Sequence, residues 1–408
     1  MMEPSKITIE GDFWDCQIYR GRLYLWESNG SLRIVNWNKL VNSFINDKLV
    51  DELALRLAFL DGRYLYNPSF SILFDDEEVK EVLIKKFKTL SDQSLVIHYR
   101  DLDSFTMGVQ DNPFQELQTD TEILNNRIYA LTYSGVFLAE ANLSSRNKFL
   151  VRKKTEKIED FVGYSIKAGK YGRLALSGGS EGLYEYDASE DFDNKIMSFD
   201  VLQKRLRKVS DRHSSFADFS YLSLYNSSNL GESFMSLFRL DQDVDFKFAS
   251  QLKTLEREIN ESEIFGSIGF NSLSWGTNEK IYKASNNVLE VVNFNNYADN
   301  GEYFSEKNQY LFHAWKGRIL KGGVAYFGAI IECENALVVL SDEREFYNIK
   351  GSVTRWRVYP RSINYENHLH VIHDNCVEIC SFNHDYFRSQ YLKDFGIKFT
   401  ELRTNKKI

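Results

Sequence analysis

Three histidines near residue 370 have the spacing that best suits chemistry. The segment reads His368-Leu-His370-Val-Ile-His373-Asp374. On a β-strand, residues two apart project from the same face, so His368 and His370 could share a metal ion, with His373 or Asp374 reaching in from a turn. The segment also fits a strand of the repeat described below, in which packing accounts for both imidazoles. We expect no bound metal and no cofactor, and His368 and His370 are the only metal candidates.

The residue patterns of the common enzyme classes are absent from the sequence. No GxSxG elbow or cysteine–histidine motif provides an activated nucleophile, and the glycines of 163–172 lack the Gly-Lys-Ser/Thr ending of a phosphate loop. Acidic groups such as Glu181 with Glu185, or the aspartates of 241–245, are typical of loops. The sequence predicts no catalytic residues. Carboxylates, or His368 and His370, at a channel mouth leave a hydrolase or lyase as an alternative.

Charge and aromatic content point to a protein partner instead. The net charge of −8 argues against a broad basic face for nucleic acid. Two basic runs, 146–154 and 204–208, could form a local patch, and two tryptophans lie beside arginine, a pairing enriched at protein interfaces. The candidate partner-binding residues are Arg152, Lys153, Lys154, Lys204, Arg205, Arg207, Trp315, Arg318 and Trp356. Solvated basic faces and core tryptophans are the alternative interpretation of these residues.

The expected compartment is the cytoplasm. No window of eighteen apolar residues occurs, and the first ten residues have neither the basic nor the apolar region of a signal peptide. The four cysteines (Cys16, Cys333, Cys376 and Cys380) are too few and too unevenly spaced for a disulfide scaffold or a CxxC metal site. We therefore expect reduced, buried thiols and no membrane insertion.

A repeated segment carries the prediction of the fold. Residues 18–32 align without a gap with residues 123–137, matching Arg22 with Arg127 and Gly30 with Gly135. The residues from each arginine to its glycine predict a strand, and each glycine supplies the turn to the return strand. Looser copies follow, and all copies together lie near residues 20, 60, 127, 173, 220, 275, 335 and 370. Seven or eight units of about four strands predict a β-propeller.

The chain resembles a divergent WD-repeat-like or quinoprotein-like β-propeller over nearly its whole length. Aromatic residues make up 14% of the sequence and only four prolines occur, which favours packed β structure. The prediction is an all-β fold, a single domain spanning 1–408, with seven blades or, alternatively, eight. Residues 6–10 alternate and could complete the final blade, as could the alternating residues 395–399.

Three segments break the strand pattern. Apolar residues at helical spacing predict helical insertions over 38–57, 75–90 and 249–261. A propeller without a catalytic set offers two rigid faces built from loops. We therefore predict a non-enzymatic protein-interaction scaffold or regulatory subunit of a cytoplasmic complex, with a ligand sensor in a multi-protein system as a further alternative.

Overall fold

The computed structural model shows two compact units of chain. It describes residues 3–46, 50–65, 70, 73–74, 76–141, 151–169, 172–188, 205–240, 253–267, 271–298, 301–315, 317–342, 345–382 and 394–397. Unit 1 is formed by Met1–Gln110 together with Gly323–Ile408, and unit 2 by Asp111–Gly322. Unit 1 therefore joins the two ends of the chain, whereas unit 2 is continuous.

Unit 1 contains three sheets. The first has β2 (Phe13–Tyr19), β3 (Arg22–Glu27), β4 (Ser31–Asn36) and β6 (Thr106–Asp111); the second has β23 (Ile319–Ala325), β24 (Gly328–Cys333), β25 (Ala336–Ser341) and β26 (Phe346–Ile349); the third has β27 (Arg355–Val358), β28 (His368–Ile372), β29 (Cys376–Ser381), β1 (Ser5–Glu10) and β5 (Leu95–Ile97). The boundary with unit 2 falls within β23.

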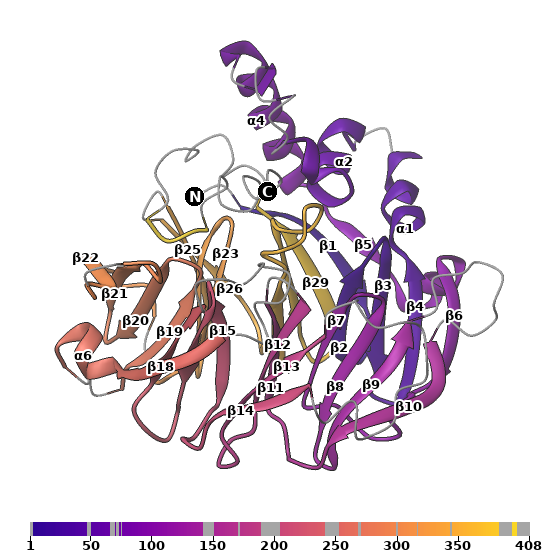
Figure 1. Ribbon diagram of the computed structural model, residues 1–408. Helices are drawn as coiled ribbons and strands as arrows, with labels where there is room; N and C mark the ends of the chain where they lie inside the picture. The colour runs from indigo at the N-terminus through magenta and orange to yellow at the C-terminus, as the bar shows by residue number, and fades with distance from the viewer. Residues whose placement is uncertain are drawn as a thin grey trace. The chain divides into compact units, whose positions relative to one another are not determined.

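Unit 2 contains four sheets, each with its strands in chain order (Figure 1). They are β7 (Asp120–Leu124), β8 (Arg127–Thr132), β9 (Gly135–Ala141) and β10 (Val151–Glu159); β11 (Ser165–Ala168), β12 (Arg173–Ser177), β13 (Leu183–Asp187) and β14 (Leu206–Ser210); β15 (Phe216–Ser220), β16 (Ser223–Ser227), β17 (Phe234–Leu240) and β18 (Lys253–Asn260); and β19 (Leu273–Thr277), β20 (Lys280–Ser285), β21 (Val288–Phe294) and β22 (Phe304–Leu311). Seven such sheets make the protein a seven-bladed β-propeller, as the repeat predicts.

The second strand of every blade follows one pattern of burial. These strands begin at Arg22, Arg127, Arg173, Ser223, Lys280, Gly328 and His368. Two residues later come Tyr24, Tyr129, Ala175, Tyr225, Tyr282, Ile330 and His370, each at most 1% exposed. Because side chains alternate along a strand, this third position always points into the blade. The residues that follow these strands support tight turns, as with Gly30, whose φ of +87° favours glycine.

Strand β1 completes the blade formed by the last strands of the chain. It pairs antiparallel with β29, from Ser5 opposite Ser381 to Glu10 opposite Cys376. Ile7 and Ile9 are fully buried, and the Lys6 ammonium donates to Glu378 at 2.7 Å. Of the two closing strands that the sequence allows, β1 is the one observed. Strand β5 extends this sheet by pairing parallel with β1.

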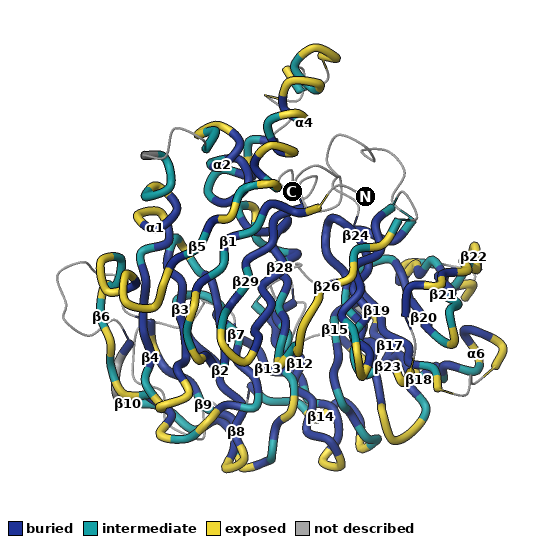
Figure 2. The backbone as a smooth tube through the Cα atoms, turned by 180° about the vertical axis from the view of Figure 1, so that it is seen from behind, coloured by how far each residue is buried: buried dark blue, intermediate teal, exposed yellow. Residues whose placement is uncertain are grey.

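The helical insertion of unit 1 lies between β4 and β5. Its α-helices are α1 (Trp37–Ser43), α2 (Glu52–Phe59) and α4 (Glu77–Ser91), and its 3-10 helices are η1 (Phe44–Asn46), η2 (Gly62–Tyr64) and, after β5, η3 (Tyr99–Ser104). Asn36, Asp51 and Asp76 cap the α-helices by accepting hydrogen bonds from backbone N–H groups of the first turn. Figures 1 and 2 show α2 and α4 beside β1 and β5, with the far end of α4 exposed. No helix among the described residues is long and apolar enough to span a membrane.

The predicted helix over 249–261 is wrong where the structure describes it. Residues 253–260 form β18, the last strand of its blade, and only Glu261–Phe265 is helical (α6). Leu255 and Ile259 are four residues apart, a spacing that places them on one face of a helix but also on one face of a strand. A shift in register, in which Leu237 faces Arg257 and Phe238 faces Leu255, further blurs the alternation. The predicted helices over 38–57 and 75–90 correspond to α1, α2 and α4.

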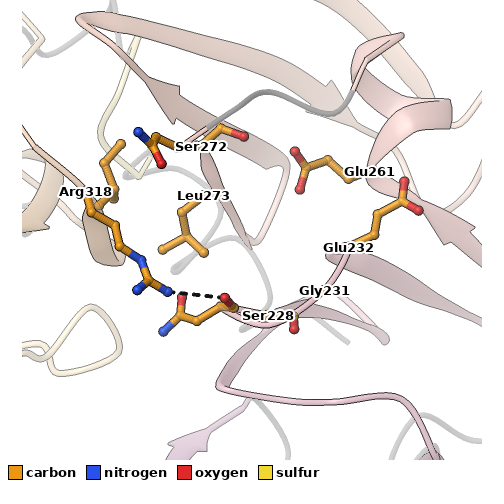
Figure 3. A pocket seen from close by; sticks show the side chains of 10 residues that line it. Ser228, Gly231, Glu232, Glu261, Ser272, Leu273 and Arg318 are labelled. Carbon is orange, nitrogen blue, oxygen red and sulfur yellow. Dashed lines mark hydrogen bonds between the residues drawn. The ribbon is translucent and has the colours of Figure 1, made fainter.

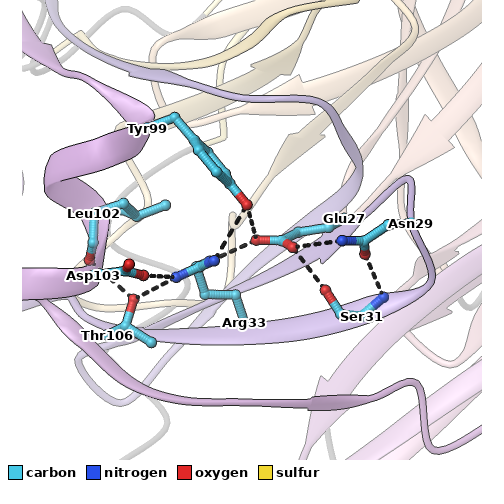
Figure 4. A network of polar contacts seen from close by, with 8 residues as sticks. All are labelled: Glu27, Asn29, Ser31, Arg33, Tyr99, Leu102, Asp103 and Thr106. Atoms are coloured by element: carbon cyan, nitrogen blue, oxygen red, sulfur yellow. Dashed lines mark hydrogen bonds and ion pairs between the residues drawn. The ribbon is translucent and has the colours of Figure 1, made fainter.

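A partly buried network of ion pairs and hydrogen bonds connects the end of the insertion to the hairpin β3–β4 (Figure 4). The Arg33 guanidinium donates through Nε to Glu27 at 2.6 Å and through Nη1 to Asp103 at 2.5 Å and to Thr106 at 3.1 Å. The Tyr99 hydroxyl donates to Glu27 at 3.2 Å. Burial opposes ionisation of Glu27, but the hydrogen bonds from Arg33, Ser31 and Tyr99 together with the Arg33 charge outweigh burial and lower the pKa of this carboxyl. Arg33 and Glu27 therefore act together as a structural pair.

Candidate functional site

A polar pocket of about 340 Å³ lies in unit 2 (Figure 3). Its walls come from the turn between β16 and β17, the start of α6, the segment leading into β19, and the start of β23. The lining residues are Ser228, Asn229, Gly231, Glu232, Glu261, Asn271, Ser272, Leu273, Arg318 and Ile319. Connections of three successive blades thus meet at one site, which is how propellers build binding surfaces.

The β16–β17 turn is shaped by hydrogen bonds from small side chains of the turn and of the segment before β15. The Ser228 N–H donates to the Ser233 hydroxyl at 3.2 Å, and the Asn229 N–H donates to the Ser215 hydroxyl at 3.0 Å. The Ser228 hydroxyl also lies 2.9 Å from Nδ1 of His213. These bonds satisfy the backbone of the turn locally and leave Leu230 at its tip 79% exposed. The rim of the pocket therefore presents an apolar side chain to solvent.

Glu261 is the most buried charged group of the pocket. The first position of α6 places it there, and only 4% of the residue is exposed. Its Oε2 accepts a hydrogen bond from the Ser274 hydroxyl at 2.6 Å, and that hydroxyl accepts one from Tyr225 at 2.8 Å. Burial, with Glu261 nearby, raises the pKa of Tyr225 well above its usual value, so Tyr225 remains a neutral donor. The relay fixes one carboxylate oxygen of Glu261.

The other oxygen of Glu261 accepts no hydrogen bond. Oε1 lies 3.4 Å from Nζ of Lys283, which is also 4.0 Å from Glu290 and donates to the Ser267 carbonyl at 2.5 Å. The Lys283 ammonium is therefore shared between the Glu261 and Glu290 carboxylates and the Ser267 carbonyl. In Figure 3 the carboxylate of Glu261 points toward the side of the pocket that holds Ser272 and Leu273.

Glu232 adds a second carboxylate. Its Oε1 accepts a hydrogen bond from the Ser262 N–H at 2.8 Å. Burial raises the pKa of Glu232, but this hydrogen bond and the charges of Arg212 and Lys283 outweigh burial, so the pKa is lowered. Glu232 is thus ionised at neutral pH, which makes it an acceptor and not a general acid.

Arg318 lies on the opposite side of the pocket, with its guanidinium beside the β16–β17 turn, whereas the Glu232 carboxylate points away from it (Figure 3). Its Nη2 donates to the Asn229 carbonyl at 3.3 Å, and the Asn229 amide donates to the Leu320 carbonyl at 3.5 Å. Arg318 is exposed, and it is the one candidate from the sequence that lines this pocket. The pocket consequently has an anionic side and a cationic side.

The two candidate tryptophans are buried. Trp315 is 3% exposed, and Trp356 is 4% exposed with its indole N–H donating to Glu332 at 2.7 Å. A Cβ at Gly323 would lie 2.6 Å from the Trp356 ring, so this glycine provides the space for the indole. Neither indole is on the surface. The alternative interpretation from the sequence, that these are core tryptophans, agrees with their burial.

The basic runs do not meet as one described patch. Arg152, Lys153 and Lys154 fall on β10, where their side chains are outside the described set, and Lys204 is outside the described residues. Arg205 is 8% exposed, and Nη1 of Arg207 donates to the Lys253 carbonyl at 3.0 Å. Arg205 is therefore buried within unit 2, and Arg207 is hydrogen-bonded to another strand of the same unit.

The histidine candidates are packed inside unit 1. Nε2 of His368 lies 2.9 Å from the Ala58 carbonyl, and Nδ1 of His370 lies 3.3 Å from the Cys16 sulfur and from the Tyr359 hydroxyl. Burial lowers the pKa of His368 to about 4 and that of His370 well below 6.5. Among the described residues no three His, Cys, Asp or Glu side chains form a group that could hold a metal ion.

The acidic groups weighed from the sequence lie elsewhere. Glu185 accepts ion pairs from Arg173 at 3.0 Å and Lys253 at 2.7 Å, all three buried, and the aspartates of 241–245 are outside the described residues. The sequence does not mark Glu232 and Glu261 as site residues, because Glu261 lies at the end of a predicted helix and Glu232 in a segment without a distinctive motif. The polar run Ser227–Ser228–Asn229, followed by Gly231 and Glu232, is the signal that could have marked the turn.

Comparisons with known proteins leave the family open. No protein-family model matches the sequence, and no curated protein matches it. Among solved structures, the chain is similar to the computationally designed Ika8 protein, with a TM-score of 0.41 and 6% identity over 93% of this chain and 100% of that one. It is also similar to Hsv2 of Kluyveromyces lactis (TM-score 0.38, 10% identity, 62% and 70% covered) and to BamB from Moraxella catarrhalis (TM-score 0.38, 10% identity, 89% and 80% covered). The fold assignment rests on the strand order.

Proposed function

We propose that this protein is a non-enzymatic interaction scaffold or regulatory subunit of a cytoplasmic complex, and that a protein partner docks on unit 2 at the pocket of Glu232, Glu261 and Arg318. The observation that carries the proposal is the construction of this site. Connections of three blades form a polar pocket with opposite charges on two walls, and an exposed leucine stands at its rim. Charged side chains beside an isolated exposed apolar group are suited to recognising another protein.

The alternative of a hydrolase or lyase has less support at this site. A pair of carboxylates in a glycosidase needs one group whose pKa is raised, so that it can protonate a leaving group. The pKa of Glu232 is lowered, and one oxygen of Glu261 is already held by Ser274. Glu232 is therefore suited to accept hydrogen bonds and not to protonate a leaving group.

The rim residue Leu230 provides the test of docking. Leu230→Asp should prevent a partner from covering the rim, because a new carboxylate would have to be desolvated in the contact. Leu311→Asp is the matched control, since Leu311 is also 79% exposed in unit 2 but does not line the pocket. Both variants would be tagged and purified from the native cell, and stoichiometric partners would be identified by mass spectrometry.

We expect the wild type and Leu311→Asp to retain the same stoichiometric partner and Leu230→Asp to lose at least nine-tenths of it, a change of about tenfold. Equal recovery with all three proteins would place the contact elsewhere. Recovery of no stoichiometric protein with the wild type would count against the scaffold itself.

A further inference from the structure

One face of helix α4 in unit 1 is exposed along its length. The opposite face is buried through Leu83, Phe87 and Leu90, which all lie beyond the first turn, and it packs on α2 and β1. The N-terminal part of the helix therefore extends away from β1 and β5 (Figures 1 and 2). Near the middle of the exposed face Val82 is 50% exposed, so an apolar side chain is in contact with solvent there.

The charges on this face are ordered along the helix. Because an α-helix has 3.6 residues per turn, five exposed residues fall within about one-third of its circumference: Glu78, Glu81, Val82, Lys85 and Lys88. Both carboxylates precede the valine and both ammonium groups follow it. The ion pairs that α4 makes within the described residues involve its other charged side chains.

The helix dipole does not account for this order. The dipole favours acidic residues in the first turn and basic residues in the last, and its effect is confined to those turns. Glu81 and Lys85 lie in the interior of the helix, and although they are four residues apart, no ion pair joins them in the described structure. The dipole also gives no reason for an exposed valine between them.

The exposed face is the electrostatic complement of a second copy of itself. We propose that two copies of this chain associate through α4, with the two helices antiparallel across a two-fold axis at Val82. Lys85 of each copy then lies beside Glu78 of the other, since these residues are three and four positions from the axis, and the two Val82 side chains meet. A parallel pair would instead bring like charges together.

The dimer should be weak and sensitive to salt. Helix α4 has 15 residues, and one face of a helix of that length buries less than the roughly 1,200 Å² of a standard interface. Much of the attraction comes from exposed charges, which salt screens. We therefore expect a dissociation constant in the micromolar range that rises with ionic strength. This association does not depend on the docking site proposed in unit 2.

The first test reverses the charges of each half of the face. Lys85→Glu with Lys88→Glu makes the face acidic throughout, and Glu78→Lys with Glu81→Lys makes it basic throughout. Each double variant alone should dimerise at least tenfold more weakly than the wild type, because like charges then meet. An equimolar mixture of the two should recover most of the wild-type affinity, since both ends of the helix pair are complementary again.

Sedimentation velocity of the full-length proteins at increasing concentration would measure these affinities. Arg100→Glu with Lys350→Glu is the matched control, because it makes the same change in net charge at exposed positions of unit 1 outside α4, and it should dimerise like the wild type. A wild type that stays monomeric, a control that loses the dimer as the acidic variant does, or a mixture no tighter than its components would each overturn the proposal.

The second test fixes the direction of the helices and does not alter their charges. Val82→Cys lies on the proposed axis and should form a disulfide between copies under mild oxidation, with the wild type as the background for the native cysteines. Two Thr89→Cys residues of an antiparallel pair would be about 20 Å apart, beyond the reach of a disulfide. Both positions are exposed.

Cross-linking through Thr89→Cys would overturn the antiparallel pair, and failure of Val82→Cys to cross-link would overturn the contact itself. Leu230→Asp should leave the dimer unchanged while it abolishes capture of the partner protein in unit 2. Failure of this inference is therefore distinct from failure of docking.

Discussion

The buried imidazoles of His368 and His370 couple the stability of the fold to pH. His368 is fully buried and its pKa falls to about 4, whereas an unfolded chain has a histidine pKa of about 6.5. Between these values the unfolded chain binds more protons than the folded one, so the free energy of unfolding rises with pH. The stabilisation is complete above about pH 6.5 and is lost as the pH falls through 6.5 toward 4.

Replacing both imidazoles should remove this dependence. For the double variant His368→Asn with His370→Phe, we expect the free energy of unfolding to vary less between pH 6.5 and 4.5 than in the wild type, which should lose about 2 kcal/mol through His368 alone. Urea unfolding at a series of pH values would measure this. His98→Gln is the control for the loss of a histidine that is exposed. An identical slope in the double variant would show that other groups control the acid sensitivity.

The same double variant addresses metal binding. Each imidazole has one nitrogen engaged by a protein atom, and the ring centroids are 5.8 Å apart. We expect purified wild-type protein to contain no stoichiometric transition metal, and the double variant to lose stability more than any activity. Elemental analysis that finds one zinc or manganese per chain, absent from the variant, would contradict this.

At the scale of elements, the network of Arg33 and Glu27 holds η3 on the hairpin β3–β4. Arg33→Met leaves the buried Glu27 carboxylate without an opposite charge beside it. This substitution should therefore cost about 3–5 kcal/mol of unfolding free energy. Adding Glu27→Gln should recover part of the loss, because the unpaired carboxylate is then gone. Asp103→Ala is the matched control, since Asp103 is 79% exposed and should cost less than about 1 kcal/mol. Denaturant unfolding of these four proteins and of Glu27→Gln alone would give these values, and additive losses in the double variant would contradict the coupling.

How far the sequence predicts these elements depends on whether they repeat. The gapless match of 18–32 with 123–137 corresponds to β2–β4 and β7–β9, because the inward third position and the turn glycine recur. The histidine segment fits a strand of the repeat, since His368 and Arg22 both begin the second strand of a blade. The expected copy near residue 60 lies in α2 and η2, and without it the count is seven.

The candidate site was less predictable, and the reason is physical. Arg318 could be found from its residue type, but the pocket forms where connections of three blades meet, and no local pattern encodes that meeting. Glu261 begins α6, directly after a strand that has the spacing of a helix. Its chemistry depends on Tyr225, Ser274 and Lys283, which lie on other strands. Sequence repeats therefore fix the blades, whereas the binding groups depend on tertiary structure.

For the whole molecule, the order of the chain makes the two units unequal. Unit 1 pairs β1 with β29, and about 210 residues of unit 2 lie between its two parts. When unit 2 is folded, the distance between the two ends of this segment is fixed. When unit 2 unfolds, unit 1 has to close a flexible loop of that length, which costs on the order of 4 kcal/mol of entropy. Unit 2 is continuous and has no such cost when unit 1 unfolds.

This asymmetry predicts a one-way effect of core substitutions. Phe238→Ala, which removes a fully buried ring in unit 2, should lower the denaturant midpoint of both units, whereas Leu369→Ala, at a fully buried position in unit 1, should lower that of unit 1 and leave that of unit 2 unchanged. Hydrogen exchange of amides in β17 and β29 at increasing urea would report the two units separately. Because both substitutions remove a fully buried apolar side chain and they lie in different units, equal effects in both directions would show that chain connectivity does not set the order of unfolding.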